Sequence, residues 1–352
     1  MIRELNNRPW VELFTTTPQS VECDRYEFLK ELKRISRQTE NYGYKGIFVN
    51  SDNQLVDSWM MTGIILSETK HLLPMIALQP IYMHPYIAAK KIASIGLIYN
   101  RPVALNLVAG GFVNGLSAIG DHTPHDKCYE RLAEYTEIIR LLLTSGKAVT
   151  YKGKFYEIMN LKLHPALPDH IQPHYYLSGS SDMARKTAAR LDASLIEYPE
   201  PTGDYEKSES TIANGISGIR VGILARHTND KAWSDARVRF SKMQSGKLSH
   251  QATSKTSDPV WHKTLSGKNG DDLSEESVYW LVPPKHDRTH CPYLVGDYEE
   301  VARELSRYLQ NGCTTCILDI PVSEIDLQST LQVFDKAFTY VEKVQYQRRS
   351  LA

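Results

Sequence analysis

The chain has 352 residues, and its 41 lysines and arginines balance its 41 aspartates and glutamates. Hydrophobic residues (41%) and aromatic residues (9%) are sufficient for a packed core, which excludes a disordered chain. The formal net charge of +0 gives no electrostatic footprint for nucleic acid or an anionic membrane. No apolar run approaches the roughly 18 residues of a membrane span, and the charged N-terminus does not resemble a signal peptide.

The five cysteines, an odd number scattered along the chain, do not form a disulfide framework. We therefore expect a protein of the reducing cytoplasm. Cys313 and Cys316 form a CxxC pair without a second pair of metal ligands nearby. This favours structural thiols, and a metal or redox role is the alternative.

Strands alternate with helices along the chain. Short apolar segments predict strands, and segments with apolar residues at helical spacing predict helices. The predicted strands are 11–17, 46–50, 72–79, 103–108, 174–177, 193–196, 220–225 and 315–320. The predicted helices are 24–40, 57–70, 85–98, 125–143, 183–191, 205–214, 230–240 and 323–341. Eight such units fit an α/β fold of the (β/α)8 TIM-barrel type with insertions. A doubly wound open sheet is the alternative, although no GxGxxG follows the first strand.

Two segments do not follow the alternation. Residues 149–163 resemble a hairpin that turns at Lys152-Gly153. Residues 241–292 are long and rich in Ser, Lys, His, Asp and Gly, as in a lid over an active site or a disordered loop. We predict one domain over 1–352 with both segments as insertions.

Gly179, Ser180 and Ser181 precede a predicted helix. A glycine allows close approach of a ligand, and free N–H groups at a helix start favour a phosphate. The alternative is an ordinary N-cap, which Ser or Asp provides for almost any helix.

Other polar residues follow or occupy the predicted strands. Asp57 either contacts a bound ring or caps a helix. His125 and Tyr129 are four residues apart and share one helix face, either above a ligand or packed on each other. Asn106 lies within a strand, where a buried amide needs a partner.

Basic residues are the candidates for binding an anionic substrate group. Arg220 begins a predicted strand, Arg226 and His227 follow it, and Arg288 and His290 lie in the long segment. Solvated surface charge is the alternative for each loop residue. The sequence has no P-loop, HExxH motif or nucleophile elbow.

Several blocks together resemble the bacterial luciferase-like flavin monooxygenase superfamily, and within it the alkanesulfonate monooxygenase branch. The resemblance covers most of the chain from about Gly46 onward. The blocks are LNLVAGG, HDKCYERLAEYTEIIRLLLTSGKAVTYKGKFYEI, YYLSGSSDMARKTAARLDASLIEYPEP, GIRVGILARHTNDKAW and YLVGDYEEVARELSRYLQNGC.

The resemblance implies a barrel that uses reduced FMN, supplied by a separate NAD(P)H:flavin reductase, and O2 to oxidise a small organic substrate. It places Ser180 and Ser181 at the flavin phosphate. It places Asp57, Asn106, His125 and Tyr129 near the flavin, with Tyr198 in place of a Trp of the branch. It also implies a non-prolyl cis peptide at Ala77–Leu78, beneath the flavin ring.

By the same resemblance, Arg220 binds or activates substrate and Arg288 is the loop arginine that closes the site. Homodimers or homotetramers are usual in the family. Four departures point to a substrate other than a sulfonate, and a specialised biosynthetic oxidation fits them. Gly222 replaces a His, Leu55 a Cys, Thr16-Thr17 a His, and Asp319-Ile320-Pro321 a Tyr. A deazaflavin-dependent dehydrogenase and a non-catalytic flavin-binding homologue are the competing hypotheses.

Overall fold

The computed structural model describes residues 11–20, 24–110, 113–201, 217–240, 277–281 and 291–350. Eight parallel strands close into a ring in the order β1-β2-β3-β4-β7-β8-β9-β12, with β12 paired to β1. They are β1 (Glu12–Thr16), β2 (Gly46–Val49), β3 (Leu73–Leu78), β4 (Ala104–Leu107), β7 (His174–Ser178), β8 (Ser194–Glu197), β9 (Gly218–Arg226) and β12 (Thr315–Leu318). The closed ring confirms the barrel and rules out the open sheet.

Apolar strands form this ring because both of their faces are buried. Every residue of β2, β3, β4 and β12 is buried. A separate cluster fills the inside of the barrel and includes Phe14, Phe48, Met75, Tyr176 and Ile317. The barrel is therefore a packed core below its mouth, and ligands are restricted to the carboxyl ends of the strands.

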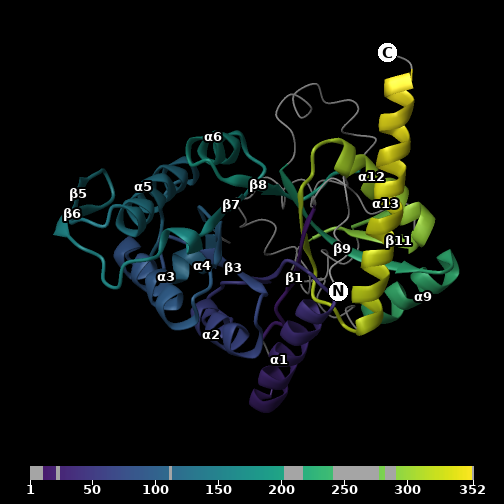
Figure 1. The fold of residues 1–352 in the computed structure, drawn as a ribbon, viewed down its shortest axis with the longest axis horizontal. Helices are drawn as coiled ribbons and strands as arrows, with labels where there is room; N and C mark the ends of the chain where they lie inside the picture. Colours follow the sequence, from purple (N-terminus) through teal and green to yellow (C-terminus); the bar gives the residue numbers. More distant parts are fainter. Residues whose placement is uncertain are drawn as a thin grey trace.

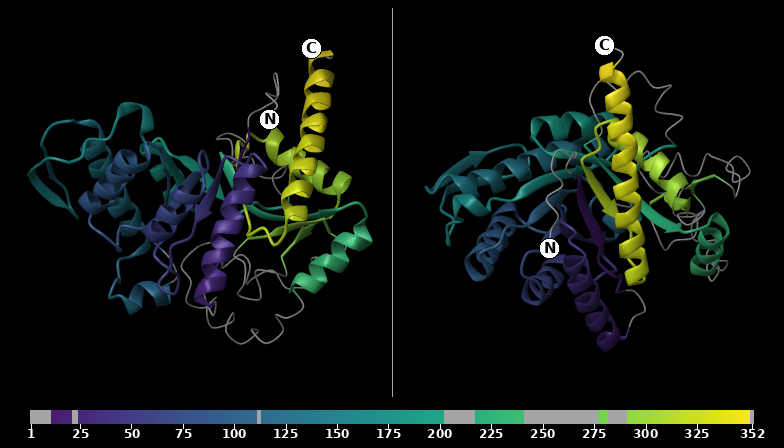
Figure 2. Two further views of the ribbon diagram at one scale, coloured as in Figure 1. Left: turned by 60° about the horizontal axis from the view of Figure 1, so that its bottom comes forward. Right: turned by 45° about the vertical axis from the view of Figure 1, so that its right-hand side comes forward.

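Helices cover the outside of the ring, with α2, α3 and α5 on one side and α9, α12 and α13 on the other (Figure 1). They are α1 (Arg25–Asn41), α2 (Ser58–Glu68), α3 (Pro85–Tyr99), α4 (Val113–Ala118), α5 (His125–Thr144), α6 (Asp182–Arg190), α9 (Asn229–Phe240), α12 (Tyr298–Gln310) and α13 (Glu324–Ser350), with a 3-10 turn at Asp169–Ile171. The end of α1 meets the start of α13, where Gln38 Nε2 donates to Glu324 Oε1 over 2.6 Å (Figure 2).

The predicted hairpin is confirmed as an antiparallel pair, β5 (Val149–Lys152) and β6 (Glu157–Leu161). A second addition to the ring was not predicted. The last five residues of β9 leave the barrel and pair in parallel with β11 (Tyr293–Asp297), which pairs in turn with the short β10 (Tyr279–Trp280). The strand β9 thus belongs to both the barrel and an outer sheet.

Some predictions fall outside the described residues. The predicted helix 205–214 lies there, as do most of the segment 241–292 and Arg288. The predicted cis peptide at Ala77–Leu78 is wrong, because His164–Pro165 is the one cis bond within the described ranges and Leu78 continues a regular strand. No helix in the described part of the chain is long and apolar enough to cross a membrane.

Candidate active site

The segment between β7 and α6 forms a tight turn at the barrel mouth. Ser181 is the N-cap of α6, and its Oγ accepts a hydrogen bond from Ala184 N over 3.1 Å. A Cβ at Gly179 would lie 2.8 Å from Ala184 Cβ and 2.9 Å from Tyr129 Oη. The glycine is needed because the turn packs so closely against α5 and α6. The structure shows the N-cap that the sequence allowed, and a cap at Ser181 is compatible with a phosphate at the start of α6.

The first turn of α5 faces this turn. The His125 and Tyr129 rings lie edge to face with centroids 5.1 Å apart. Ser181 Oγ donates to Tyr129 Oη over 3.5 Å, so the two helix starts are in contact. Burial raises the pKa of Tyr129, and the hydrogen bond from Ser181 opposes the shift. The Tyr129 hydroxyl is neutral at physiological pH and serves as a hydrogen-bonding group.

Arg185 joins the turn to the neighbouring strand. Its guanidinium donates to Ser180 O over 2.8 Å and to Glu197 Oε1 over 2.7 Å. Burial raises the pKa of Glu197, and the charge of Arg185 opposes this. The pair holds the carbonyl of Ser180 in place, and so fixes the shape of the turn.

Asn106 and Ala77 lie side by side on β4 and β3 at the same level of the barrel. Asn106 is buried, and its Oδ1 accepts a hydrogen bond from Ser178 Oγ over 2.9 Å. A protein hydroxyl, that of Ser178, is therefore the partner of the amide oxygen. Its NH2 group remains oriented by that bond.

Asp57 is the exposed N-cap of α2, where its Oδ1 accepts from Trp59 N and Met60 N, both over 3.0 Å. The structure thus shows the capping role that the sequence left open. Nothing in the described part of the chain brings Asp57 into contact with the turn at Gly179, so its flavin contact remains a prediction.

Arg220 stands inside the barrel mouth on β9. Its guanidinium lies 4.8 Å from the Phe48 ring centroid, and Nη2 donates to Asn50 Oδ1 over 3.4 Å. The Nε atom is buried and has no hydrogen-bond partner among the described residues. Tyr198 is beside it: burial raises the pKa of Tyr198, and the charge of Arg220 opposes this. A half-buried arginine with an unused donor can bind a polar or anionic group.

Two residues of the mouth were not foreseen as a pair. The Tyr293 ring on β11 covers Gly222, and its Oη donates to Asp319 Oδ2 over 2.5 Å. The signal was partly present, since Gly222 and Asp319 are departures from the sulfonate branch. Their connection through Tyr293 depends on the pairing of β11 with β9. The paired residues Tyr293 and Gly222 are 71 positions apart in the sequence. A small cavity of about 20 Å³ beside the pair has room for one water.

The CxxC pair lies at the other end of β12, away from this mouth. Both thiols are buried, and the two Sγ atoms are 3.8 Å apart. The hydrogen bond with Cys313 and burial raise the pKa of Cys316. No cluster of three metal-ligating side chains occurs in the described ranges. These features agree with structural thiols.

An eight-stranded (β/α)8 barrel defines a class of protein whose active sites lie at the carboxyl ends of the strands, and the helix-start turn after β7 and the polar mouth lie at that end. Residues 11–315 match the family model for luciferase-like monooxygenases. The chain therefore belongs to the luciferase-like monooxygenase family of enzymes.

Relatives agree with this assignment. The chain is 32% identical over 305 residues to the monooxygenase BtrO of Niallia circulans, with 85% of this chain and 89% of that protein covered. BtrO is named for its substrate, the 4-(gamma-L-glutamylamino)butanoyl group on the BtrI acyl-carrier protein.

Solved structures agree in fold. The long-chain alkane monooxygenase LadA superposes with a TM-score of 0.69 at 15% identity, over 96% of this chain and 92% of that one. The EDTA monooxygenase EmoA from Chelativorans sp. BNC1 gives 0.70 at 14%, over 95% and 94%. An F420-dependent secondary alcohol dehydrogenase gives 0.64 at 17%, over 93% and 99%.

Proposed function

We propose that the protein is a two-component monooxygenase, which takes reduced FMN from a separate NAD(P)H:flavin reductase and inserts one atom of O2 into a small organic substrate. The observation that carries this proposal is the turn at Gly179–Ser181, which opens α6 against Tyr129 at the mouth of a luciferase-like barrel. When bound, the flavin supplies the activation of oxygen, and the protein supplies position and dryness.

The residues of the mouth fit an FMN. Ser180 and Ser181 would hold the phosphate through their hydroxyl and N–H groups at the positive end of α6. The close packing around Gly179 supports this fit, since a Cβ there would displace Tyr129. Asn106 and Tyr129 would hydrogen-bond the flavin, and His125 would pack beside it.

The remaining predicted residues act around the ring and the substrate. Ala77 would lie beneath the ring, where its methyl group leaves room. Tyr198 would line the pocket, and Asp57 would approach from α2. Arg220 would bind the substrate through its guanidinium, whose Nε has no hydrogen-bond partner among the described residues. Arg288 would close over the site.

The substrate class to test first is an acyl group carried by an acyl-carrier protein. This comes from the printed substrate of BtrO, at 32% identity. Such a substrate belongs to a specialised biosynthetic pathway, which agrees with the departures from the sulfonate branch. Membership of that branch remains a proposal that rests on the sequence blocks.

The test is the affinity for oxidised and reduced FMN, measured by fluorescence quenching, anaerobically for the reduced form. We expect tighter binding of the reduced form. Ser180→Ala/Ser181→Ala should weaken it about ten-fold or more, because hydrogen bonds to a charged group are lost. The matched control is Asp24→Ala, which removes the N-cap of α1 away from the mouth and should leave the affinity unchanged.

The same titration decides between the alternatives. Tighter binding of a deazaflavin than of FMN would favour a hydride-transferring dehydrogenase, and structural neighbours include an F420-dependent enzyme. Binding of FMN without turnover of any acyl substrate, in the presence of reductase, NADH and O2, would favour a non-catalytic homologue. Under the proposal, Arg220→Ala binds FMN and loses turnover.

Partners follow from the chemistry. We propose a separate NAD(P)H:flavin reductase as the source of reduced FMN, as the resemblance to the family implies. We propose a homodimer or homotetramer, as in the family, and sedimentation of the purified protein tests this.

A further inference from the structure

We propose that Asp319 is the substrate-selecting residue of this site: positioned by Tyr293, it accepts a hydrogen bond from an N–H group of the substrate and disfavours a sulfonate. The inference rests on the proposed function, because it places a substrate at the barrel mouth. It names a residue and a chemical class for that substrate.

Asp319 and Gly222 lie at the mouth of the barrel, above its interior cluster. Ile317 belongs to the interior cluster, and Asp319 directly follows the end of β12; its bond to the Tyr293 hydroxyl, whose ring lies on Gly222, places its carboxylate at the mouth. Arg220 lies over the interior Phe48, and Gly222 follows it by two residues. Gly222 and Asp319 are therefore one level above Arg220, toward the mouth.

The ring of Tyr293 takes the space above Gly222. An added Cβ at Gly222 would lie 2.3 Å to 2.6 Å from three ring carbons. Tyr293 lies opposite Gly222 in the register of β11 with β9, and Phe240 packs against its ring with centroids 5.1 Å apart. The ring is thus locked, and its hydroxyl crosses β9 to reach Asp319 on β12.

The hydrogen bonds around Asp319 make its carboxylate a hydrogen-bond acceptor. Tyr293 Oη commits its proton to Asp319 Oδ2 over 2.5 Å, and Ile320 N donates to Oδ1 over 2.8 Å. Burial and the charge of Asp319 raise the pKa of Tyr293 well above its ordinary value, so the phenol keeps this proton. An ionised carboxylate has about four acceptor positions, so unused ones remain on Asp319.

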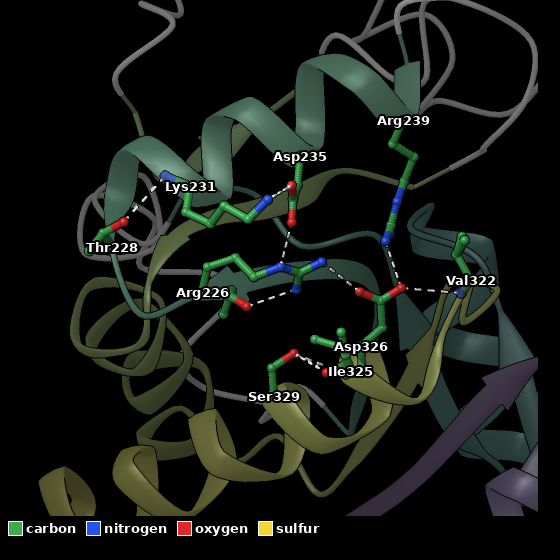
Figure 3. A network of polar contacts seen from close by, with 10 residues as sticks. Arg226, Thr228, Lys231, Asp235, Arg239, Val322, Ile325, Asp326 and Ser329 are labelled. Atoms are coloured by element: carbon green, nitrogen blue, oxygen red, sulfur yellow. Dashed lines mark hydrogen bonds and ion pairs between the residues drawn. The ribbon is translucent and has the colours of Figure 1, made fainter.

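Two neighbouring cations, Arg239 and Arg226, are paired with other carboxylates, and a third, Arg220, donates to Asn50 one level below Asp319. Arg239 donates to Asp326 over 2.6 Å, and Arg226 bonds Asp235 over 2.7 Å and Asp326 over 3.0 Å (Figure 3). Asp319 forms no ion pair within the described part of the chain, and it is half-buried where Tyr293 is buried. An N–H group satisfies such a carboxylate, whereas a sulfonate placed against it would be repelled.

The test uses three ligands of one chain length: hexylamine, hexanamide and hexane-1-sulfonate. Each is titrated into the full-length protein, with and without FMN, and tryptophan fluorescence is followed, because Trp280 and Tyr293 both pack against Phe240. We expect hexylamine and hexanamide to bind roughly ten-fold tighter than the sulfonate. Asp319→Asn should remove most of this preference for hexylamine.

Two tyrosine variants separate position from packing. Tyr293→Phe keeps the ring over Gly222 and removes the hydroxyl, so it should weaken hexylamine binding roughly two- to ten-fold. Tyr176→Phe is the matched control, since Tyr176 Oη also donates to a carboxylate, Glu12 Oε2, over 2.5 Å, but at the start of β1, the end of the barrel opposite the mouth. It should leave the preference unchanged.

Three outcomes would overturn the inference: equal or tighter binding of the sulfonate by the wild type, an unchanged preference in Asp319→Asn, or no saturable binding of hexylamine. Each is read without turnover. Failure of the proposed function is a different result, namely no binding of FMN.

Discussion

The backbone of Gly222 lies against the ring of Tyr293, and no methyl group fits between them. We therefore predict that Gly222→Ala destabilises the protein by about 1–3 kcal/mol, the usual cost of overpacking. Urea denaturation measures the loss. Combining it with Tyr293→Ala should restore part of it, so that the two changes are not additive.

The matched control is Gly63→Ala. Gly63 lies within α2 with no atom near its missing Cβ. This change should be neutral or stabilise by up to about 1 kcal/mol, because alanine favours helix. Equal losses in the two variants would mean that the Tyr293 contact is not responsible.

For individual residues, the sequence predicted which polar side chains lie at the barrel mouth, but not all of the hydrogen bonds between them. The cap at Ser181 and the neighbourhood of His125 and Tyr129 follow from local spacing, and they were foreseen. The Tyr293–Asp319 bond was not, because it depends on a strand register between distant segments. Local patterns carry no information on such a register.

Among the elements, α9, α13 and β9 are joined through Asp326, which accepts from both Arg226 and Arg239 (Figure 3). The carboxylate is 6% exposed and the two guanidinium side chains are 12% and 17% exposed. We predict that Asp326→Ala costs about 3 kcal/mol, because Arg239 loses its carboxylate partner and Arg226 keeps only Asp235. Thermal and urea unfolding check this value.

Asp230→Ala provides the comparison, since Asp230 is exposed in the first turn of α9, the helix that carries Arg239. Its cost should stay within about 0.5 kcal/mol. An equally small loss of unfolding free energy in Asp326→Ala would mean that water replaces the carboxylate, and it would contradict the prediction.

The connection between α4 and α5 depends on pH through Asp121. Burial opposes ionisation of this carboxyl, but its hydrogen bonds with Arg131 and Thr123 outweigh burial and lower its pKa. A lowered pKa in the folded state gives stability that is present above the unfolded pKa and is lost as the pH falls through the folded one. We predict that the stability gap between wild type and Asp121→Asn is largest near neutral pH and closes below about pH 4.

Urea titrations between pH 3 and pH 7 measure this gap. Asp169→Asn, at an exposed carboxylate in a 3-10 turn, should show no comparable dependence. A gap that stays constant with pH would refute the role of the Asp121–Arg131 pair.

For the whole molecule, the closed ring predicts one cooperative unit. β8 pairs with β9 and β12 pairs with β1, so no half of the ring keeps its edges satisfied alone. Unfolding should therefore give one transition with the same midpoint by far-ultraviolet circular dichroism and by tryptophan fluorescence. Trp59 reports on one side of the ring, and Trp233 and Trp280 report on the other. Two separated transitions would contradict the single domain predicted from the sequence.

The barrel itself could be predicted because its signals are local and repeated. All eight ring strands coincide with predicted apolar segments. The helix α12 and the strand β11 were not placed, although YLVGDYEEVARELSRYLQNGC was recognised as a family block. They follow a long polar segment that hid the return to the sheet. The proline cis bond was also missed, and the non-prolyl one was expected from resemblance alone.

The strand β9 belongs to the barrel in its first half and to the outer sheet in its second. The residue that shapes the mouth above Gly222 is therefore carried by a segment outside the eight-stranded ring. Exchange of that segment alone, a five-residue strand with its flanks, would change the pocket without altering the sequence of any ring strand. The substrate preference of this barrel could therefore be altered through a peripheral segment while the ring strands keep their sequence.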